Sequence, residues 1–401
     1  MPQCREPFAT KRTPARLGLI LAFYAFIAIG IAEGGLGVLL PSIMQTFHLT
    51  PATVTLLFLS QITGYLVAAF TSSLLSNQMG LARMLLLAST FLTSALIIYA
   101  SAPLWGIMVM TGTILGLGIG LIDAGINTYI VNDSQHSHFI GVLHGFYGTG
   151  ALLGPAIATT LLWMHLPWRI VYLVFAGVVF LLVAAMLWVI ATDYKPLTRQ
   201  VTVSSGDARA NLRTALRTPA VLVSGLLLLV YVGTEVVLGN WAYSVQTISR
   251  NTPELVAGYS ISAYWMGLTI GRMGMGYAIK HLGTIRMIDF SLTLLTLGLL
   301  TWWLLPNQVL SLPVMGFALA AIFPTTMLLV PQRVAAPLVP AAIGFLTSLA
   351  SLGAASIPTG VGWIADWAGL EIIPILMLPL AALMMLLHRW LAGHTLNVMS
   401  Q

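Results

Sequence analysis

Four ionisable side chains stand inside long apolar stretches of this sequence: Glu33, Asp123, Glu235 and Arg272. A carboxylate can hold and release a proton, and its oxygens accept hydrogen bonds from the hydroxyls of a polar solute. A charged side chain deep in an apolar layer is expensive, so by default it lines a pathway or meets a partner. These four residues are therefore the first candidates for chemistry, with the three acids as proton-coupling groups.

The stretch from 111 to 131 holds the clearest pattern. It is almost wholly apolar and long enough to cross a bilayer as a helix. Its small and polar residues recur at steps of three or four, which places them on one helical face: Gly112, Gly116, Gly120, Asp123 and Asn127. We predict that Asp123 and Asn127 contact a solute. The alternative is a packing seam of small residues in which Asp123 is hydrogen-bonded.

Composition indicates the medium that surrounds the chain. Of its 401 residues, 58% are hydrophobic and only 7% are charged, whereas soluble domains carry about 25% charged residues. The mean hydropathy is +0.93. We therefore expect a polytopic protein embedded in a lipid bilayer. The single cysteine, Cys4, excludes a disulfide within the chain. No Cys/His set has the spacing of a metal site, and we expect no cofactor.

The apolar stretches predict an all-α membrane protein with twelve transmembrane helices. The expected spans are 17–44, 51–76, 82–101, 104–131, 138–162, 168–192, 219–247, 255–280, 285–305, 309–332, 338–366 and 370–391. The only long polar connection is a linker over 193–218. It separates an N-terminal six-helix bundle, 1–192, from a C-terminal six-helix bundle, 219–401.

The basic residues predict the orientation of the chain. If the N-terminus is inside, 14 of the 17 lysines and arginines face the cytoplasm, as the positive-inside rule requires. These are Arg5, Lys11, Arg12, Arg16, Arg83, Lys195, Arg199, Arg209, Arg213, Arg217, Lys280, Arg286, Arg333 and Arg389. The net charge of +6 thus indicates topology, and no nucleic-acid partner is expected. We expect a monomer in the plasma membrane, which in bacteria is the inner membrane, with both termini cytoplasmic.

The two halves of the sequence repeat each other. The residues of the first half that recur after a shift of 203 positions are Gly64, Gly80, Arg83, Met84, Gly150 and Pro155. Their counterparts are Gly267, Gly283, Arg286, Met287, Gly353 and Pro358. Two parallel six-helix repeats joined by a basic loop describe the major facilitator architecture, with the halves related by a pseudo-two-fold axis along the membrane normal.

Several motifs resemble the fucose permease-like group of that superfamily, the fucose–galactose–glucose:proton symporters. The motifs are Tyr231-Val232-Gly233-x-Glu235, Gly267-Leu268-Thr269-x-Gly271-Arg272, Phe323-Pro324-Thr325, Gly353-x-x-x-x-Pro358 and His144-Gly145-Phe146-Tyr147-Gly148. The resemblance covers nearly the whole chain. It implies proton-coupled transport of a monosaccharide, or of a similar small neutral polar solute, by alternating access.

The same resemblance implies a role for each acid. Proteins of this group use one acid in helix one and another in helix four, and Glu33 and Asp123 match those positions with the Asp and Glu types exchanged. Helices one, four, seven and ten line the central cavity in this architecture, which would place Glu235 there too. The alternative for Glu235 is a structural pair with Arg272. We expect Arg272 to gate or to stabilise rather than to bind substrate.

Polar and aromatic residues supply the other predicted substrate contacts, because sugar rings stack on aromatic faces and sugar hydroxyls need amides and carboxylates. They are Gln61, Tyr65, Asn127, Tyr147, Asn240, Trp241 and Tyr264. We expect His144 to bond at the interface between the halves, with proton relay as the alternative. Gly148 and Gly353 are expected to allow close contact with the opposite half.

Glu33 and Asp123 are expected to have different duties. Asp123 has Asn127 one turn away and should hold substrate hydroxyls as well as a proton. Glu33 is flanked by glycines, with little else in the sequence to stabilise its charge, so it is the expected proton carrier.

Two other functions fit the sequence. One is a multidrug exporter of the same fold that exchanges protons for apolar or cationic compounds. The other is a membrane sensor or partner protein that transports nothing. No enzyme is indicated, because the sequence has neither a phosphate-binding glycine loop with a lysine nor a G-x-S-x-G elbow.

Overall fold

The computed structural model describes residues 16–132, 140–198 and 213–399. Within these residues every regular element is a helix. Ten helical stretches of this part of the chain are long and apolar enough to cross a membrane. The expectation of an all-α membrane protein is confirmed, while the number of twelve spans stays a prediction. The basic N-terminal residues 1–15 and most of the expected linker, 199–212, lie outside the described residues.

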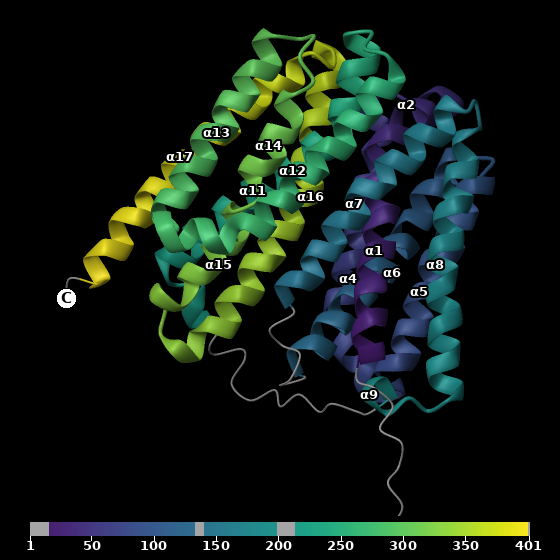
Figure 1. The fold of residues 1–401 in the computed structure, drawn as a ribbon, viewed down its shortest axis with the longest axis horizontal. Coiled ribbons are helices and arrows are strands. Elements are labelled where there is room, and N and C mark those ends of the chain that lie inside the picture. The colour runs from purple at the N-terminus through teal and green to yellow at the C-terminus, as the bar shows by residue number, and fades with distance from the viewer. Residues whose placement is uncertain (1–15, 133–139, 199–212, 400–401) are drawn as a thin grey trace, which may run out of the picture.

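The helices form two groups that lie side by side (Figure 1). The first group is α1 (Arg16–Gly34), α2 (Leu36–Phe47), α3 (Pro51–Val54), α4 (Leu56–Met79), α5 (Leu81–Ser101), α6 (Trp105–Asn132), α7 (Ile140–Trp163), α8 (Trp168–Ala191) and the short α9 (Lys195–Thr198). The second group is α11 (Pro219–Ser244) with the π-helix η2 (Val245–Ser249), α12 (Glu254–Leu282), α13 (Thr284–Leu304), α14 (Ser311–Leu319), α15 (Ile322–Leu329), α16 (Val339–Ala368) and α17 (Ile372–Met399), with two 3₁₀ turns, Val330–Gln332 and Ala336–Leu338, before α16.

Three of the expected spans are interrupted, and one of them, 51–76, breaks at Thr55 between α3 and α4. The stretch predicted as 17–44 breaks at Gly35, where α1 ends and α2 begins. A Cβ on Gly34 would lie 2.5 Å from the carbonyl oxygen of Ala151 in α7, so the glycine pair lets two backbones approach closely. The stretch predicted as 309–332 breaks between α14 and α15. The last helix, expected to end at 391, continues to Met399.

The repeat predicted from the sequence is visible in matching backbone contacts. A Cβ on Gly64 in α4 would lie 1.9 Å from the carbonyl oxygen of residue 113 in α6. A Cβ on its counterpart Gly267 in α12 would lie 2.1 Å from the carbonyl oxygen of residue 313 in α14. Gly80 and Gly283 take positive φ angles of 84° and 81°, and both end one helix of their half and precede the next. Corresponding helices therefore pack through corresponding glycines.

The two groups meet at the end where α2 stops and diverge toward the end where α1 starts and α9 lies (Figure 1). At the meeting end, a Cβ on Gly37 in α2 would lie 2.2 Å from the carbonyl oxygen of Gly239 in α11. The backbone N–H of Ala52 donates to Oδ1 of Asp366 in α16 at 3.4 Å. The rings of Phe58 in α4 and Trp241 in α11 meet edge to face, with 6.1 Å between their centroids. Backbone and side-chain contacts thus close this end between the halves.

Candidate functional site

Asp123 lies in α6 and is held by two neighbours. The Tyr65 hydroxyl of α4 donates to Oδ2 at 2.6 Å, and Nδ2 of Asn127 donates to Oδ1 at 2.8 Å. The glycine face of α6 packs against α4, since a Cβ on Gly116 would lie 1.8 Å from the carbonyl oxygen of Gln61. The geometry therefore contains the packing seam that was the alternative for this face. Asp123 itself stays only partly buried beside it.

Glu33 occupies the last turn of α1, next to the break at Gly35. The Tyr147 hydroxyl of α7 donates to its Oε2 at 2.9 Å, so Glu33 has a partner that the expectation from its glycine neighbours did not include. The charges of Glu33 and Asp123 act on each other, and neither acid makes an ion pair within the described residues. Two partly buried carboxylates that make no ion pair within the described residues therefore share one half of the protein.

Glu235 in α11 has a different environment. It is 8% exposed, and the Tyr231 hydroxyl one turn earlier donates to its Oε2. Its Oε1 lies 3.6 Å from a terminal nitrogen of Arg272 in α12. The structural pair that was the alternative for Glu235 is therefore present, and the charge of this acid is balanced within its own half.

The seam between α7 and α12 joins the two halves close to these acids. A Cβ on Gly148 would lie 2.4 Å from Oγ1 of Thr269 in α12, so Gly148 lies against the opposite half, while its role in transport stays a prediction. Farther along the seam, the hydroxyls of Thr160 and Tyr259 lie 2.9 Å apart. Because helices without side-chain bulk can approach closely, the seam can hold the halves together along much of its length.

The same expectation is wrong for Gly353. A Cβ on this residue would lie 2.0 Å from the carbonyl oxygen of Leu229 in α11, which belongs to its own half. Its repeat counterpart Gly150 packs in the same way, 2.2 Å from the carbonyl oxygen of Ile27 in α1. Gly353 therefore joins two helices within one half, as the repeat demands.

The remaining predicted substrate residues divide into packed and open positions. Trp241 and Tyr264 are fully buried; the Trp241 indole N–H donates to the carbonyl oxygen of Pro358 at 3.1 Å, and the Tyr264 hydroxyl donates to the backbone oxygen of Glu235 at 3.0 Å. Both side chains are thus used in packing in this structure. Asn240 and Gln61 are partly buried.

His144 has an exposed side chain on α7, and its ring meets that of Phe26 edge to face at 5.5 Å. It lies near enough to Asp123 and to Arg272 for their charges to act on it. Within the described residues, His144 does not make the expected hydrogen bond across the interface.

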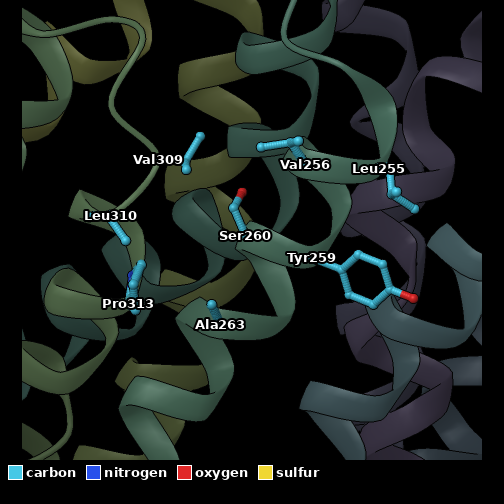
Figure 2. A pocket seen from close by; sticks show the side chains of 8 residues that line it. All are labelled: Leu255, Val256, Tyr259, Ser260, Ala263, Val309, Leu310 and Pro313. Carbon is cyan, nitrogen blue, oxygen red and sulfur yellow. The ribbon is translucent and has the colours of Figure 1, made fainter.

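An apolar groove lies apart from all these residues. It has a volume of about 310 Å³ and runs between α12 and the start of α14. Figure 2 shows Val256 and Ala263 on one side and Val309, Leu310 and Pro313 on the other. None of the predicted substrate residues lines it. This groove therefore lacks the polar residues that were predicted to contact a hydroxylated solute.

The tyrosine partners of the acids were the main feature that sequence reasoning missed. Tyr65 and Tyr147 were predicted to bind substrate, yet their hydroxyl hydrogens are used by Asp123 and Glu33. In the sequence, Tyr231 stands out only as the first residue of the motif that ends at Glu235. Its spacing of four residues before Glu235 places both on one helical face, and this signal alone was available in the sequence.

Comparisons with known proteins indicate the family and the fold of this chain. A model of the Major Facilitator Superfamily matches residues 21–314. The chain is 25% identical over 361 residues to the glucose/mannose transporter GlcP of Bacillus subtilis, covering 86% of this chain and 88% of that protein. It is 25% identical over 403 residues to Bypass of stop codon protein 6 of Saccharomyces cerevisiae, covering 92% and 81%.

Three solved structures share the fold. The nucleoside transporter NupG has a TM-score of 0.76 at 13% identity, covering 94% of this chain and 99% of that one. The D-xylose-proton symporter has a TM-score of 0.71 at 14% identity, covering 92% and 97%. The fucose:proton symporter FucP of E. coli has a TM-score of 0.63 at 15% identity, covering 94% and 98%. At these identities the likeness shows the fold alone.

Proposed function

Because this chain belongs to the major facilitator superfamily, it is a multi-pass membrane transporter and not an enzyme, and we propose that it carries a monosaccharide or a similar small neutral polar solute together with protons. One observation carries the proposal. Glu33 and Asp123 lie partly buried in one half, interact through their charges and make no ion pair within the described residues. A carboxylate that makes no ion pair can take up a proton without leaving a buried cation unpaired, which suits proton coupling.

The solute class follows from the same groups. Asp123 offers carboxylate oxygens beside the amide of Asn127, and such acceptors and donors match the hydroxyls of a sugar. The relative GlcP is named a glucose/mannose transporter, which makes a hexose the first solute to test. Arg272 is an arginine near the acids, and its neighbour Glu235 balances its charge, so an anionic solute finds no unpaired guanidinium there.

Transport would follow alternating access between two halves, residues 1–192 and 219–401. The contacts between α2 and α11 and between α3 and α16 support a state that is closed on the side away from α9. With both termini in the cytoplasm, that closed side is the outer one. We place the protein in the plasma membrane, in bacteria the inner membrane, and as a monomer.

The test is binding and flux with purified protein. Glucose, mannose, galactose, fucose and xylose are screened by thermal shift, and the best ligand is then used labelled in liposomes. With one proton per sugar, a gradient of ~1 pH unit supports about tenfold accumulation. A protonophore should abolish that accumulation. The proposal is wrong if no sugar is concentrated by the proton gradient while cationic or apolar compounds are.

A further inference from the structure

A chain of polar groups crosses the α7–α12 seam at the depth of the acids. On the α7 side, the Tyr147 hydroxyl donates to Glu33. On the α12 side, Arg272 pairs with Glu235 at 3.6 Å. The charge of Arg272 acts on Tyr147 across the seam. Arg272 thus pairs with the acid of its own half and lies within electrostatic reach of the tyrosine that holds the acid of the other half.

The pairing of Arg272 is incomplete. A distance of 3.6 Å is longer than an N–H···O hydrogen bond, which spans about 2.7–3.2 Å. Its Nε is buried and makes no hydrogen bond within the described residues. A guanidinium carries five N–H donors, and each buried donor that makes no hydrogen bond costs free energy. Arg272 therefore has donors to spare for a second partner.

Tyr147 can act as that partner without leaving Glu33. A hydroxyl has one hydrogen to donate and two lone pairs to accept with, so Tyr147 can donate to Glu33 while accepting from Arg272. Ionised Glu33 favours this arrangement, because its negative charge attracts the guanidinium of Arg272 toward Tyr147. Protonated Glu33 removes that attraction, and Arg272 is then held only by partners of its own half, Glu235 and Tyr231.

The α7–α12 seam next to these groups is packed closely enough for a movement of Arg272 to affect it. Thr269 precedes Arg272 by three residues and would meet a Cβ on Gly148, the neighbour of Tyr147, at 2.4 Å. A small shift of Arg272 toward or away from α7 therefore changes the packing of two helices from opposite halves. Packed interfaces of this kind move between discrete arrangements rather than deforming gradually.

We propose that Arg272 is the positioning residue through which the protonation of Glu33 reaches the C-terminal half, by pulling on the α7–α12 seam when Glu33 is ionised and releasing it when Glu33 is neutral. This inference rests on the proposed proton-coupled function. The other titratable groups that face Glu33 or Arg272 are Asp123 of α6, Tyr65 of α4, His144 of α7, Glu235 and Tyr231 of α11, and Tyr264 of α12.

The experiment measures the spread of the two halves and needs no knowledge of the solute. Spin labels are placed on Leu74→Cys in α4 and Ile343→Cys in α16, both exposed positions, in a Cys4→Ser background. The distance distribution is recorded across a pH series. In the otherwise unchanged protein the ratio of the two populations should change at least ~fivefold, the lower end of typical coupling between sites.

Each variant then has a defined expectation. Glu33→Gln should show no pH response. Arg272→Gln should reduce the response to less than ~twofold, and Arg272→Lys, which keeps the charge, should retain part of it. The neutral double variant Glu235→Gln/Arg272→Gln keeps the C-terminal half balanced, so it separates a lost signal from a damaged fold. It should also lack the response.

The outcomes distinguish the two proposals. If the double variant regains the full pH response, Arg272 only neutralises Glu235 and the inference is overturned, while proton sensing by Glu33 stands. If Glu33→Gln keeps the response, or the unchanged protein shows none, proton coupling at Glu33 is itself wrong and the inference falls with it.

Discussion

The two halves of this transporter both place carboxylates within their helices but surround them differently. In the N-terminal half, Glu33 and Asp123 each accept a tyrosine hydroxyl and make no ion pair with an arginine or lysine within the described residues. In the C-terminal half, Glu235 accepts a tyrosine hydroxyl and also pairs with Arg272. The tyrosine is common to all three acids, and the base is present in one half only.

This difference separates two ways of keeping an acid in a membrane. A carboxylate with only hydroxyl and amide partners can become neutral by taking a proton, and it then still has useful hydrogen bonds. A carboxylate paired with a guanidinium is balanced already, and protonating it would leave the cation alone. The N-terminal acids thus suit a proton that comes and goes, whereas Glu235 suits a fixed charge balance.

The largest expected effect tests that balance. Glu235→Gln leaves Arg272 buried without its carboxylate, and breaking one partner of a buried pair costs about 3–5 kcal/mol. Asp123→Asn keeps an acceptor for Tyr65 and should cost no more than about 1 kcal/mol. The measurement is thermal and denaturant unfolding of the solubilised protein. Equal losses for the two variants would erase the contrast between the halves.

The next effect concerns the proton. Glu33→Gln resembles the protonated acid, so it should abolish accumulation of sugar under a pH gradient while exchange of labelled for unlabelled sugar continues. Asp123→Asn should in addition weaken sugar binding about tenfold, since hydrogen bonds to a charged group are among the stronger ones. Liposome exchange and gradient-driven uptake are measured on both variants. Continued accumulation by Glu33→Gln would assign the proton to another residue.

A smaller effect is expected at the seam that joins the two halves. Gly148→Leu forces a side chain into Thr269, and overpacking of about 1–3 kcal/mol should lower transport roughly tenfold while membrane insertion stays normal. Gly145→Leu on the same helix is the matched control, because nothing lies within 4 Å of a Cβ there. Equal activity of the two variants would mean that the seam need not stay tight.

Much of the fold could be predicted because span length and apolarity are local properties. The expected span 82–101 is realised as Leu81–Ser101, and the repeat reappears in the contacts of Gly64 and Gly267. The break at Gly35 could not be predicted, since a glycine inside an apolar helix is compatible with either a continuous or an interrupted element. Only the approach of α7 decides it.

The site was predictable to the level of residue type and no further. Acidic residues inside apolar helices are costly and therefore rare, so the sequence alone identifies Glu33 and Asp123 as candidates. Their partners Tyr147 and Tyr65 lie 114 and 58 positions away, so no spacing rule connects them. The error for Gly353 has a similar cause, because a small residue favours close packing without saying which neighbour approaches.

The smallest predicted effects separate the duties of the two N-terminal acids. Tyr65→Phe and Tyr147→Phe each remove one hydroxyl and keep the ring, so packing is preserved in both. Tyr65 holds Asp123, the proposed sugar contact, and its loss should raise the dissociation constant for sugar about threefold to tenfold. Tyr147 holds Glu33, the proposed proton site, and its loss should leave that constant within about twofold while moving the pH at half-maximal accumulation by about half a unit. Binding titrations and uptake across a pH series measure the two quantities on both variants. If both substitutions change sugar affinity alike and leave the pH profile alone, the acids share one duty, and the division of labour within the N-terminal half is wrong.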